Sequence, residues 1–393
     1  MATKAHKLLA KRLNQLPPLK SVINELLLEI LELLFSEEEA LIASKVTILS
    51  PTAEKVARRV HRPVEEVRVI LDRLADRGVI FAFGDGADRK YIVMPMMPGI
   101  FEAFMYKAPD DERTRRFAAL FEQYYNLEYS QKMLIGPSKV FRIIPIQESL
   151  ADIKTGVLPS ESIREIIDRQ DAWSLASACA CRRQKEYVGQ RCSHPMDVCM
   201  QFGAAARYVE KVGFGRMVSK QEILEAVDRA EDSGLIHFTD NIENPAICCN
   251  CCACCCVSLA TMTKFNTPAM FVNSRYAARF DVGRCVSCGA CAKVCPAGAL
   301  HLYDTKLIHE PWRCIGCGIC VAKCKTGALS MVLREEPRAV PENYGQLMVD
   351  VGNENMRIQR FMDTYMPGYK KSIGDWLQAQ MAKILSAGAN ETR

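Results

Sequence analysis

One cysteine motif occurs twice towards the end of the chain, and no other feature restricts the fold as strongly. The first copy begins at Cys285 and the second at Cys314, and each has the spacing Cys-x2-Cys-x2-Cys-x3-Cys with Gly-Ala-Leu shortly after it. Two residues between cysteines let a tight loop direct three thiolates at one metal cluster, and small residues such as Gly289 let the backbone approach it. The repeat therefore predicts a duplicated iron–sulfur unit.

The repeat resembles bacterial two-cluster ferredoxins over residues 276–334. In those proteins the fourth cysteine of each run binds the cluster that the other run holds. A zinc ribbon would instead have paired Cys-x2-Cys knuckles well separated in sequence, which fits this repeat poorly. The resemblance implies two [4Fe–4S] clusters, one held by Cys285, Cys288, Cys291 and Cys324 and the other by Cys314, Cys317, Cys320 and Cys295.

The positions of the cysteines also divide the chain. All nineteen lie between Cys179 and Cys324, which leaves a cysteine-free first part of ordinary globular composition. We expect an α+β protein with a central α/β domain and a C-terminal two-[4Fe–4S] ferredoxin-like domain. The expected parts are a winged-helix-like domain (1–97), a helical linker region (98–172), a central cysteine-rich iron–sulfur domain (173–265), the two-cluster ferredoxin domain (276–334) and a helical C-terminal extension (335–393).

The first hundred residues have the pattern of a winged helix-turn-helix. Apolar positions in 19–35 predict an amphipathic helix. Its apolar face either packs in the core or forms the interface of a homo-oligomer. Ser36 and Glu39 form a predicted capping box that opens the next helix. Two more helices are predicted before Gly78, and two apolar runs joined by the turn 84–86 predict a hairpin, or wing.

A winged helix raises the alternative of a DNA-binding redox sensor. The recognition helix of such a protein contacts DNA phosphates through cationic side chains, usually in its first turn. Here that turn holds Glu65 and Glu66, and residues 1–100 carry fifteen Lys/Arg against thirteen Asp/Glu. This small excess of positive charge is well below that of a typical DNA-binding domain. We therefore expect a docking or dimerisation domain and no specific nucleic-acid partner.

The middle of the chain alternates helical and strand patterns. Ser219 and Glu222 form a second predicted capping box. The predicted helices are 98–126, 160–168, 200–211 and 219–232, and the predicted strands are 140–146, 174–178 and 235–238.

The densest metal-binding pattern of the chain lies between residues 248 and 256. It contains two interleaved Cys-x2-Cys-x2-Cys ladders, one starting at Cys248 and one at Cys249, and only steric room decides which of them binds iron. Four earlier cysteines could form one cluster, and the alternatives are a structural zinc site or unligated thiols. His194 and His237 lie nearby, although a surface or core histidine is the commoner outcome. We expect one or two further clusters, with candidate ligands Cys179, Cys181, Cys192, Cys199, Cys248, Cys249, Cys251, Cys252, Cys254 and Cys255.

The central pattern resembles a group of iron–sulfur proteins of anaerobic bacteria and archaea. It combines Cys-x-Cys-Arg, Cys-x2-Pro-x3-Cys-Met-x-Phe-Gly and Asn-Cys-Cys-x-Cys-Cys. The resemblance implies a cluster-carrying electron-transfer component without naming a substrate. Redox proteins are the expected partners, in particular a flavin- or metal-containing oxidoreductase of which this chain would be a subunit. The alternatives are a redox-responsive transcriptional regulator and an enzyme that binds substrate at a central cluster.

Several other classes are disfavoured. No apolar run reaches the roughly eighteen residues of a membrane span. Glu25 and Glu29 interrupt the only apolar run near the start, which is unlike a secretory signal. No nucleophile–base pair, phosphate loop or dinucleotide fingerprint is present, so no catalytic residue is assigned. We expect a cytoplasmic protein of an anaerobe.

Overall fold

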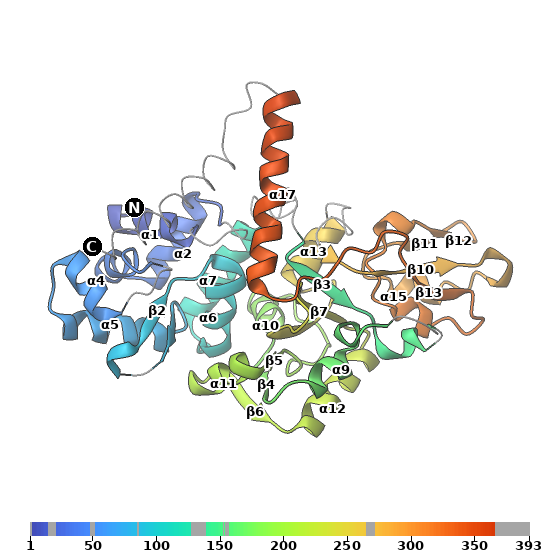
Figure 1. The fold of residues 1–393 in the computed structure, drawn as a ribbon, viewed down its shortest axis with the longest axis horizontal. Coiled ribbons are helices and arrows are strands. Elements are labelled where there is room, and N and C mark those ends of the chain that lie inside the picture. The colour runs from blue at the N-terminus through green and yellow to red at the C-terminus, as the bar shows by residue number, and fades with distance from the viewer. Residues whose placement is uncertain are drawn as a thin grey trace.

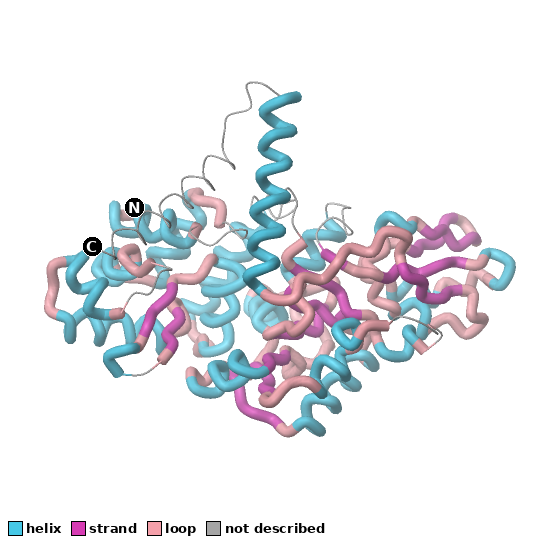
Figure 2. Tube along the Cα trace, viewed as in Figure 1, coloured by secondary structure: helices cyan, strands magenta, loops and turns pink. Residues whose placement is uncertain are grey.

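The chain folds into three parts that lie side by side (Figure 1). Helices of the first 126 residues form one end, a seven-stranded sheet lies in the middle, and the cysteine repeat forms the other end. Figure 2 shows that strands are concentrated in the middle and at the end formed by the cysteine repeat, so the fold is α+β. The computed structural model describes residues 2–14, 21–47, 52–84, 86–126, 139–151, 153, 157–264 and 272–365.

The N-terminal part is a group of helices with one short hairpin. Asn24 begins the second helix by accepting a hydrogen bond from the Leu27 N–H at 2.9 Å, so this helix is shorter than its apolar pattern. The predicted hairpin is present as β1 (Phe81–Phe83) paired antiparallel with β2 (Lys90–Ile92). The helices are α1 (Lys4–Leu13), α2 (Glu25–Leu34), α3 (Glu37–Ala43), α4 (Ala53–Val60), α5 (Val64–Asp76), α6 (Phe101–Lys107) and α7 (Glu112–Tyr124).

The helices α6 and α7 belong to the same hydrophobic core as α1 to α5. The rings of Phe101 and Phe121 stack with centroids 4.0 Å apart. The Tyr124 hydroxyl accepts a hydrogen bond from the Val22 N–H at 2.7 Å and donates one to the Val22 carbonyl at 3.1 Å. The first half of the predicted linker region therefore packs with the N-terminal helices, and residues 127–138 lie outside the described residues.

The predicted capping box at Ser36 and Glu39 is confirmed. The Glu39 carboxylate is almost fully buried, accepts the Ser36 N–H at 2.9 Å, and pairs with Arg77 at 3.0 Å and Arg73 at 3.3 Å. Burial alone would raise the pKa of Glu39, but the Ser36 N–H and the Arg77 guanidinium outweigh it, so the pKa is lowered. The ionised carboxylate therefore stabilises the fold at neutral pH.

Replacing Glu39 by glutamine is expected to lower the free energy of unfolding at pH 7 by about 2 kcal/mol, since hydrogen bonds to a charged group are lost in a buried place. A carboxyl whose pKa is lowered stabilises above its unfolded-state pKa, and this stabilisation disappears as the pH falls towards the folded-state value. Urea unfolding followed by circular dichroism should thus separate variant and parent at pH 7 and not at pH 3. The control is Glu37→Gln, an exposed position in the same helical turn. Equal losses in both variants would contradict the assignment.

The central part is built on one mixed sheet in the order β6-β4-β5-β8-β7-β3-β9. All neighbours are antiparallel except β3 and β9. An α/β domain would be mainly parallel, so the prediction of a central α/β domain is corrected to a mostly antiparallel α+β arrangement. The strands are β3 (Phe141–Ile144), β4 (Trp173–Ala176), β5 (Met200–Phe202), β6 (Gly215–Val218), β7 (Ile236–Asp240), β8 (Ile247–Cys251) and β9 (Val272–Asn273).

Two helices cover one face of this sheet. Ile163 and Ile166 of α9 and Ile223 and Val227 of α12 share a core with Met200 and its neighbours in the sheet. The capping box at Ser219 that opens α12 is confirmed. The predicted helix 200–211 is wrong at its start, because residues 200–202 pair with β4 and β8 before the helix begins. The helices are α9 (Ile163–Asp168), α10 (Ala180–Tyr187), α11 (Gly203–Lys211), α12 (Lys220–Asp232) and α13 (Val257–Lys264).

The cysteine repeat folds into two similar halves joined by short strands. Strand β10 (Tyr276–Phe280) pairs antiparallel with β13 (Leu329–Leu333), and β11 (Leu300–Tyr303) with β12 (Lys306–His309). Each half contributes one short helix, α15 (Ala290–Val294) or α16 (Ile319–Ala322). The long helix α17 (Tyr344–Tyr365) follows and extends away from the sheet (Figure 1). In the part of the chain that the structure describes, no helix is both long and apolar enough to cross a membrane.

Candidate metal centres

The cysteine repeat brings thiols of its two runs together in two places, and each place includes one cysteine from the other run. Cys295, Cys314, Cys317 and Cys320, here the inner set, line one small cavity of about 20 Å³. In the outer set, Cys291 is influenced by the charges of Cys324 and Cys288. Cys295 and Cys324 therefore each lie with thiols of the other run. The outer set is named here as Cys288, Cys291 and Cys324, together with Cys285, which the resemblance adds.

The backbone around these thiols suits an iron–sulfur cluster. N–H groups point at sulfur from Ala299 to Cys295 at 3.2 Å and from Ala278 to Cys314 at 3.4 Å. Gly316 has φ +71° and lies so close to the Tyr276 carbonyl that a side chain would overlap it. Burial raises the pKa of the Cys317 thiol to about 12, so binding of metal has to displace its proton. These residues fit a thiolate-ligated cubane.

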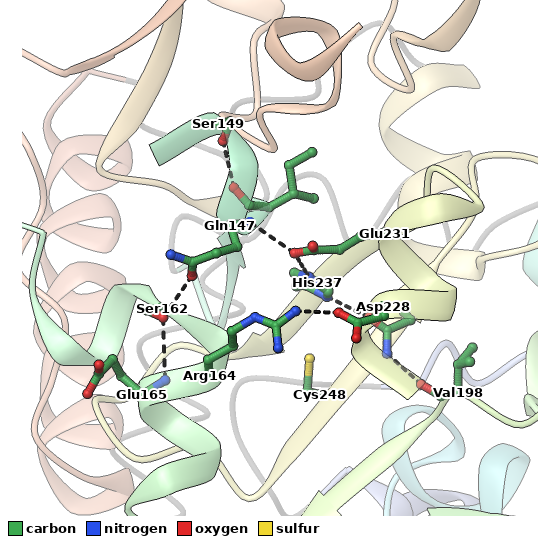
Figure 3. A network of polar contacts seen from close by, with 12 residues as sticks. Gln147, Ser149, Ser162, Arg164, Glu165, Val198, Asp228, Glu231, His237 and Cys248 are labelled. Atoms are coloured by element: carbon green, nitrogen blue, oxygen red, sulfur yellow. Dashed lines mark hydrogen bonds and ion pairs between the residues drawn. The ribbon is translucent and has the colours of Figure 1, made fainter. Parts of the chain in front are cut away.

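Strand β8 decides which of the central cysteines can meet. Successive side chains of a strand point to opposite faces. Cys248 therefore faces α9 and α12 and belongs to the apolar core there, on the side where Arg164 and Asp228 meet (Figure 3). Cys249 and Cys251 face the other way, towards α10. Neither predicted ladder is brought together as a whole. Cys248 and Cys251 lie on opposite faces of β8, and Cys249 of β8 is not grouped with Cys252 and Cys255, which lie beyond the end of the strand.

Six central thiols form a closed ring, named here the six-thiol ring. Each interacts with two others: Cys179 with Cys181 and Cys199, Cys249 with Cys199 and Cys251, and Cys256 with Cys181 and Cys251. The neighbouring thiols of Cys199 and Cys251 lower the pKa of Cys249 to about 5, which favours a thiolate there. The structure thus adds Cys256 to the candidates, which the ladder pattern had left out. The feature of the sequence that could have indicated Cys256 is its position directly after the turn 253–255, which follows β8.

A second and smaller cluster, named here the four-thiol group, consists of Cys192, Cys252, Cys254 and Cys255. Their sulfur atoms all lie within 4.8 Å of one another. Cys252 and Cys255 are buried, Cys192 is half-buried and Cys254 is exposed. Of the four cysteines first expected to act together, Cys179, Cys181 and Cys199 are in the ring and Cys192 is here.

Arg182 lies between the two thiol clusters. Its side chain is 2% exposed, and it donates hydrogen bonds to the carbonyls of Asn250 at 2.7 Å and Pro195 at 2.6 Å. Burial acts against its charge, but the thiols of Cys179 and Cys252 outweigh burial and raise the pKa of the guanidinium. A fixed cation here offsets the negative charge of thiolate-bound metal.

A polar network on the far face holds β8 in place. His237 is fully buried and bonds with Asn250 at 2.6 Å and Glu231 at 3.1 Å. Glu231 also accepts the Gln147 N–H, and Asn250 donates to the Val198 carbonyl (Figure 3). His237 is therefore a core histidine whose contacts fix the register of the strand. That register directs Cys249 and Cys251 at the ring.

The six-thiol ring faces a cavity of about 320 Å³ between the N-terminal helices and the sheet. Its walls are mostly apolar and aromatic, and they include Tyr106, Tyr208 and Phe214. The Glu102 side chain also lines it, and burial raises the pKa of this carboxyl to about 7. The cavity is much larger than the one at the inner set of the repeat.

One apolar core connects the ring to the repeat. Cys251 and Cys256 of the ring and Cys317 of the inner set belong to it, together with Ile143 and Ile146. The Ile146 N–H donates to the Cys317 carbonyl at 3.0 Å across this junction. The outer set lies further out, and its Cys288 is exposed. The three cysteine groups therefore follow one another from the interior to the surface.

Comparison with known families agrees with the geometry of the repeat. Residues 277–325 match the family model described as a 4Fe-4S dicluster domain. Neither a curated protein nor a solved structure matches the chain. The match and the clustered cysteines identify an iron–sulfur protein, and the dicluster domain indicates iron–sulfur electron transfer.

Proposed function

We propose that the chain is an electron-transfer subunit of an anaerobic oxidoreductase complex, with one cluster at each set of the repeat and a further cluster at the six-thiol ring. The observation that carries this proposal is the shared apolar core of Cys251, Cys256 and Cys317. Bound [4Fe–4S] clusters supply one-electron transfer over a wide range of potentials. The chain supplies the thiolates, excludes water between the inner set and the ring, and leaves the outer set accessible.

The surface near the outer set supports docking of a partner protein. Val286, two residues before the exposed Cys288, is 68% exposed, and Leu302 beside Gly289 is 45% exposed. Exposed apolar side chains near a metal centre are typical of an interaction site. Residues 285–334 carry six Lys/Arg and two Asp/Glu, a balance of +4, which roughly cancels about −4 from two thiolate-ligated clusters. A nearly neutral surface favours a fixed subunit over a freely diffusing carrier.

The N-terminal helices serve as a winged-helix-like docking domain in this proposal. The arginines that could meet phosphates are engaged by carboxylates of the same part: Arg68 by Glu54, and Arg89 by Asp72 at 3.0 Å. Arg62 likewise pairs with Glu66 at 2.6 Å. Contacts of this kind oppose binding to a nucleic acid, which disfavours the regulator alternative.

Reduction of the full chain by a small reduced electron-carrier protein tests the proposal. Such a donor docks at the surface, so Cys317→Ser at the junction should slow reduction of the central cluster by about tenfold or more. Dithionite is small, and it should reduce that cluster equally fast in parent and variant. Both rates are followed by visible and electron paramagnetic resonance spectra, with Cys248→Ser as the control. An unchanged rate with the protein donor in Cys317→Ser would contradict the proposed order of centres, from the outer set through the inner set to the ring.

One observation favours a second function, an enzyme that binds substrate at the central cluster. The cavity of about 320 Å³ is larger than the cavity of about 20 Å³ at the inner set, and the half-buried Glu102 that lines it could hold or release a proton there. A small apolar molecule that shifts the spectrum of the central cluster in the full chain would support this function. A spectrum that no such molecule shifts would leave electron transfer as the role of the ring.

A further inference from the structure

We propose that Cys192, Cys252, Cys254 and Cys255 bind one tetrahedral metal ion, zinc or iron, at a site separate from the iron–sulfur clusters. The sulfur atoms of this four-thiol group all lie within 4.8 Å of one another, and those of Cys254 and Cys255 are 3.7 Å apart. Four thiolates that surround a single ion at about 2.3 Å lie about 3.8 Å apart at the corners of a tetrahedron. The observed spacing is close to that geometry.

A cubane needs a wider cage than this one. Four irons and four sulfides stand between its thiolates, so the sulfur atoms of its ligands cannot come as close as they do around one ion. Within the described residues, neither the eight cysteines of the repeat nor the six-thiol ring forms so compact a group. The same chain therefore carries two kinds of thiol site, and only the four-thiol group has mononuclear dimensions.

The local sequence explains the narrow cage. Cys252 and Cys255 have the Cys-x2-Cys spacing of a zinc knuckle, and residues 253–255 form a tight turn. The adjacent Cys254 and Cys255 both contribute their sulfur atoms to the group, 3.7 Å apart, which leaves little space between them. Cys192 completes the set from the loop that follows α10.

The site has a structural consequence for the ring. The turn 252–255 separates two ring members, Cys251 at the end of β8 and Cys256 at the start of the next segment. A metal that holds this turn against the loop of Cys192 fixes the distance between those two ring thiols. The buried Arg182, which interacts with Cys252, offsets the charge of four thiolates around a divalent ion.

Metal analysis of the full chain tests this proposal. Anaerobically prepared protein, supplied with iron, sulfide and zinc, should contain about one metal ion per chain beyond the clusters. Cys192→Ser should remove that one ion while iron and sulfide of the clusters stay unchanged. The matched control, Cys248→Ser, should keep it, since Cys248 belongs to the apolar core on the other face. Zinc is recognised by elemental analysis, and single iron by its electron paramagnetic resonance signal. Either ion supports the site.

A second measurement begins with the parent protein. Cobalt(II) offered to it should enter the group from its exposed side and give the intense visible bands of tetrahedral cobalt bound by four thiolates. Cys254→Ser, a change at an exposed position that the fold should tolerate, should alter those bands. Loss of about four irons with their sulfides in Cys192→Ser, together with no tetrahedral cobalt bands in the parent, would overturn the proposal in favour of a cubane. Absence of any additional ion and of any cobalt spectrum in the parent would overturn it in favour of free thiols.

Discussion

Replacing Cys256 by serine is expected to remove the proposed central iron–sulfur cluster from the full chain and leave the two clusters proposed for the repeat in place. Cys256 interacts with the ring thiols of Cys181 and Cys251, so its loss opens the ring at one point. A cluster that loses a buried thiolate ligand is held by fewer bonds and becomes exposed to exchange. We expect a loss of about four irons or more per chain, with matching sulfide.

The control lies in the same run of cysteines. Cys248→Ser changes a residue that packs with Ile144 and Met200 on the opposite face of the sheet, so iron and sulfide should remain at the parent level. The ladder interpretation of the sequence includes Cys248 among the candidate ligands and does not include Cys256. Iron and sulfide determination on the two variants therefore separates the two interpretations. Retention of all iron in Cys256→Ser together with loss in Cys248→Ser would show that the ring is the wrong grouping.

The repeat could be read from the sequence because its ligands are local. All eight of its thiols come from two short runs of four cysteines. The exchange of Cys295 and Cys324 between the sets follows from the resemblance to two-cluster ferredoxins. The match of residues 277–325 to a dicluster domain agrees with this prediction. In the structure, Cys295 lies with Cys314, Cys317 and Cys320 of the other run.

The central site could not be predicted in the same way, since its grouping depends on a strand. The spacing of cysteines in 248–256 suggests ladders only if the run is a loop. Once residues 247–251 pair with β7 and β5, the two-residue period of the strand separates Cys248 from Cys249 and Cys251. Long-range pairing of this kind leaves little local signal. The same cause explains why residues 200–202, predicted as helix, form a strand.

Replacing Gly318 by alanine is expected to disrupt the junction between the repeat and the central part. Gly318 has φ +79°, and a Cβ there would overlap the side chain of Ser149. The Ser149 hydroxyl donates to the Ile146 carbonyl at 2.8 Å, and the Ile146 N–H bonds with the Cys317 carbonyl. The junction therefore has no room for an added methyl group. A shift of the backbone at this junction should displace Cys317 from the apolar core that Cys317 shares with the ring.

The matched control is Gly234→Ala, since Gly234 has φ +68° and nothing within 4 Å of its would-be Cβ. Both variants carry the cost of a left-handed backbone, about 1–2 kcal/mol, but only Gly318→Ala should add overpacking of about 1–3 kcal/mol. Thermal unfolding followed by circular dichroism measures the difference. The protein-donor assay should show slower reduction of the central cluster in Gly318→Ala alone. Adding Ser149→Gly removes the overlapping side chain and should restore most of the loss, because the clash and not the backbone angle distinguishes the two glycines. Equal effects of the two alanine substitutions, or no rescue by Ser149→Gly, would mean that this junction does not control the position of Cys317.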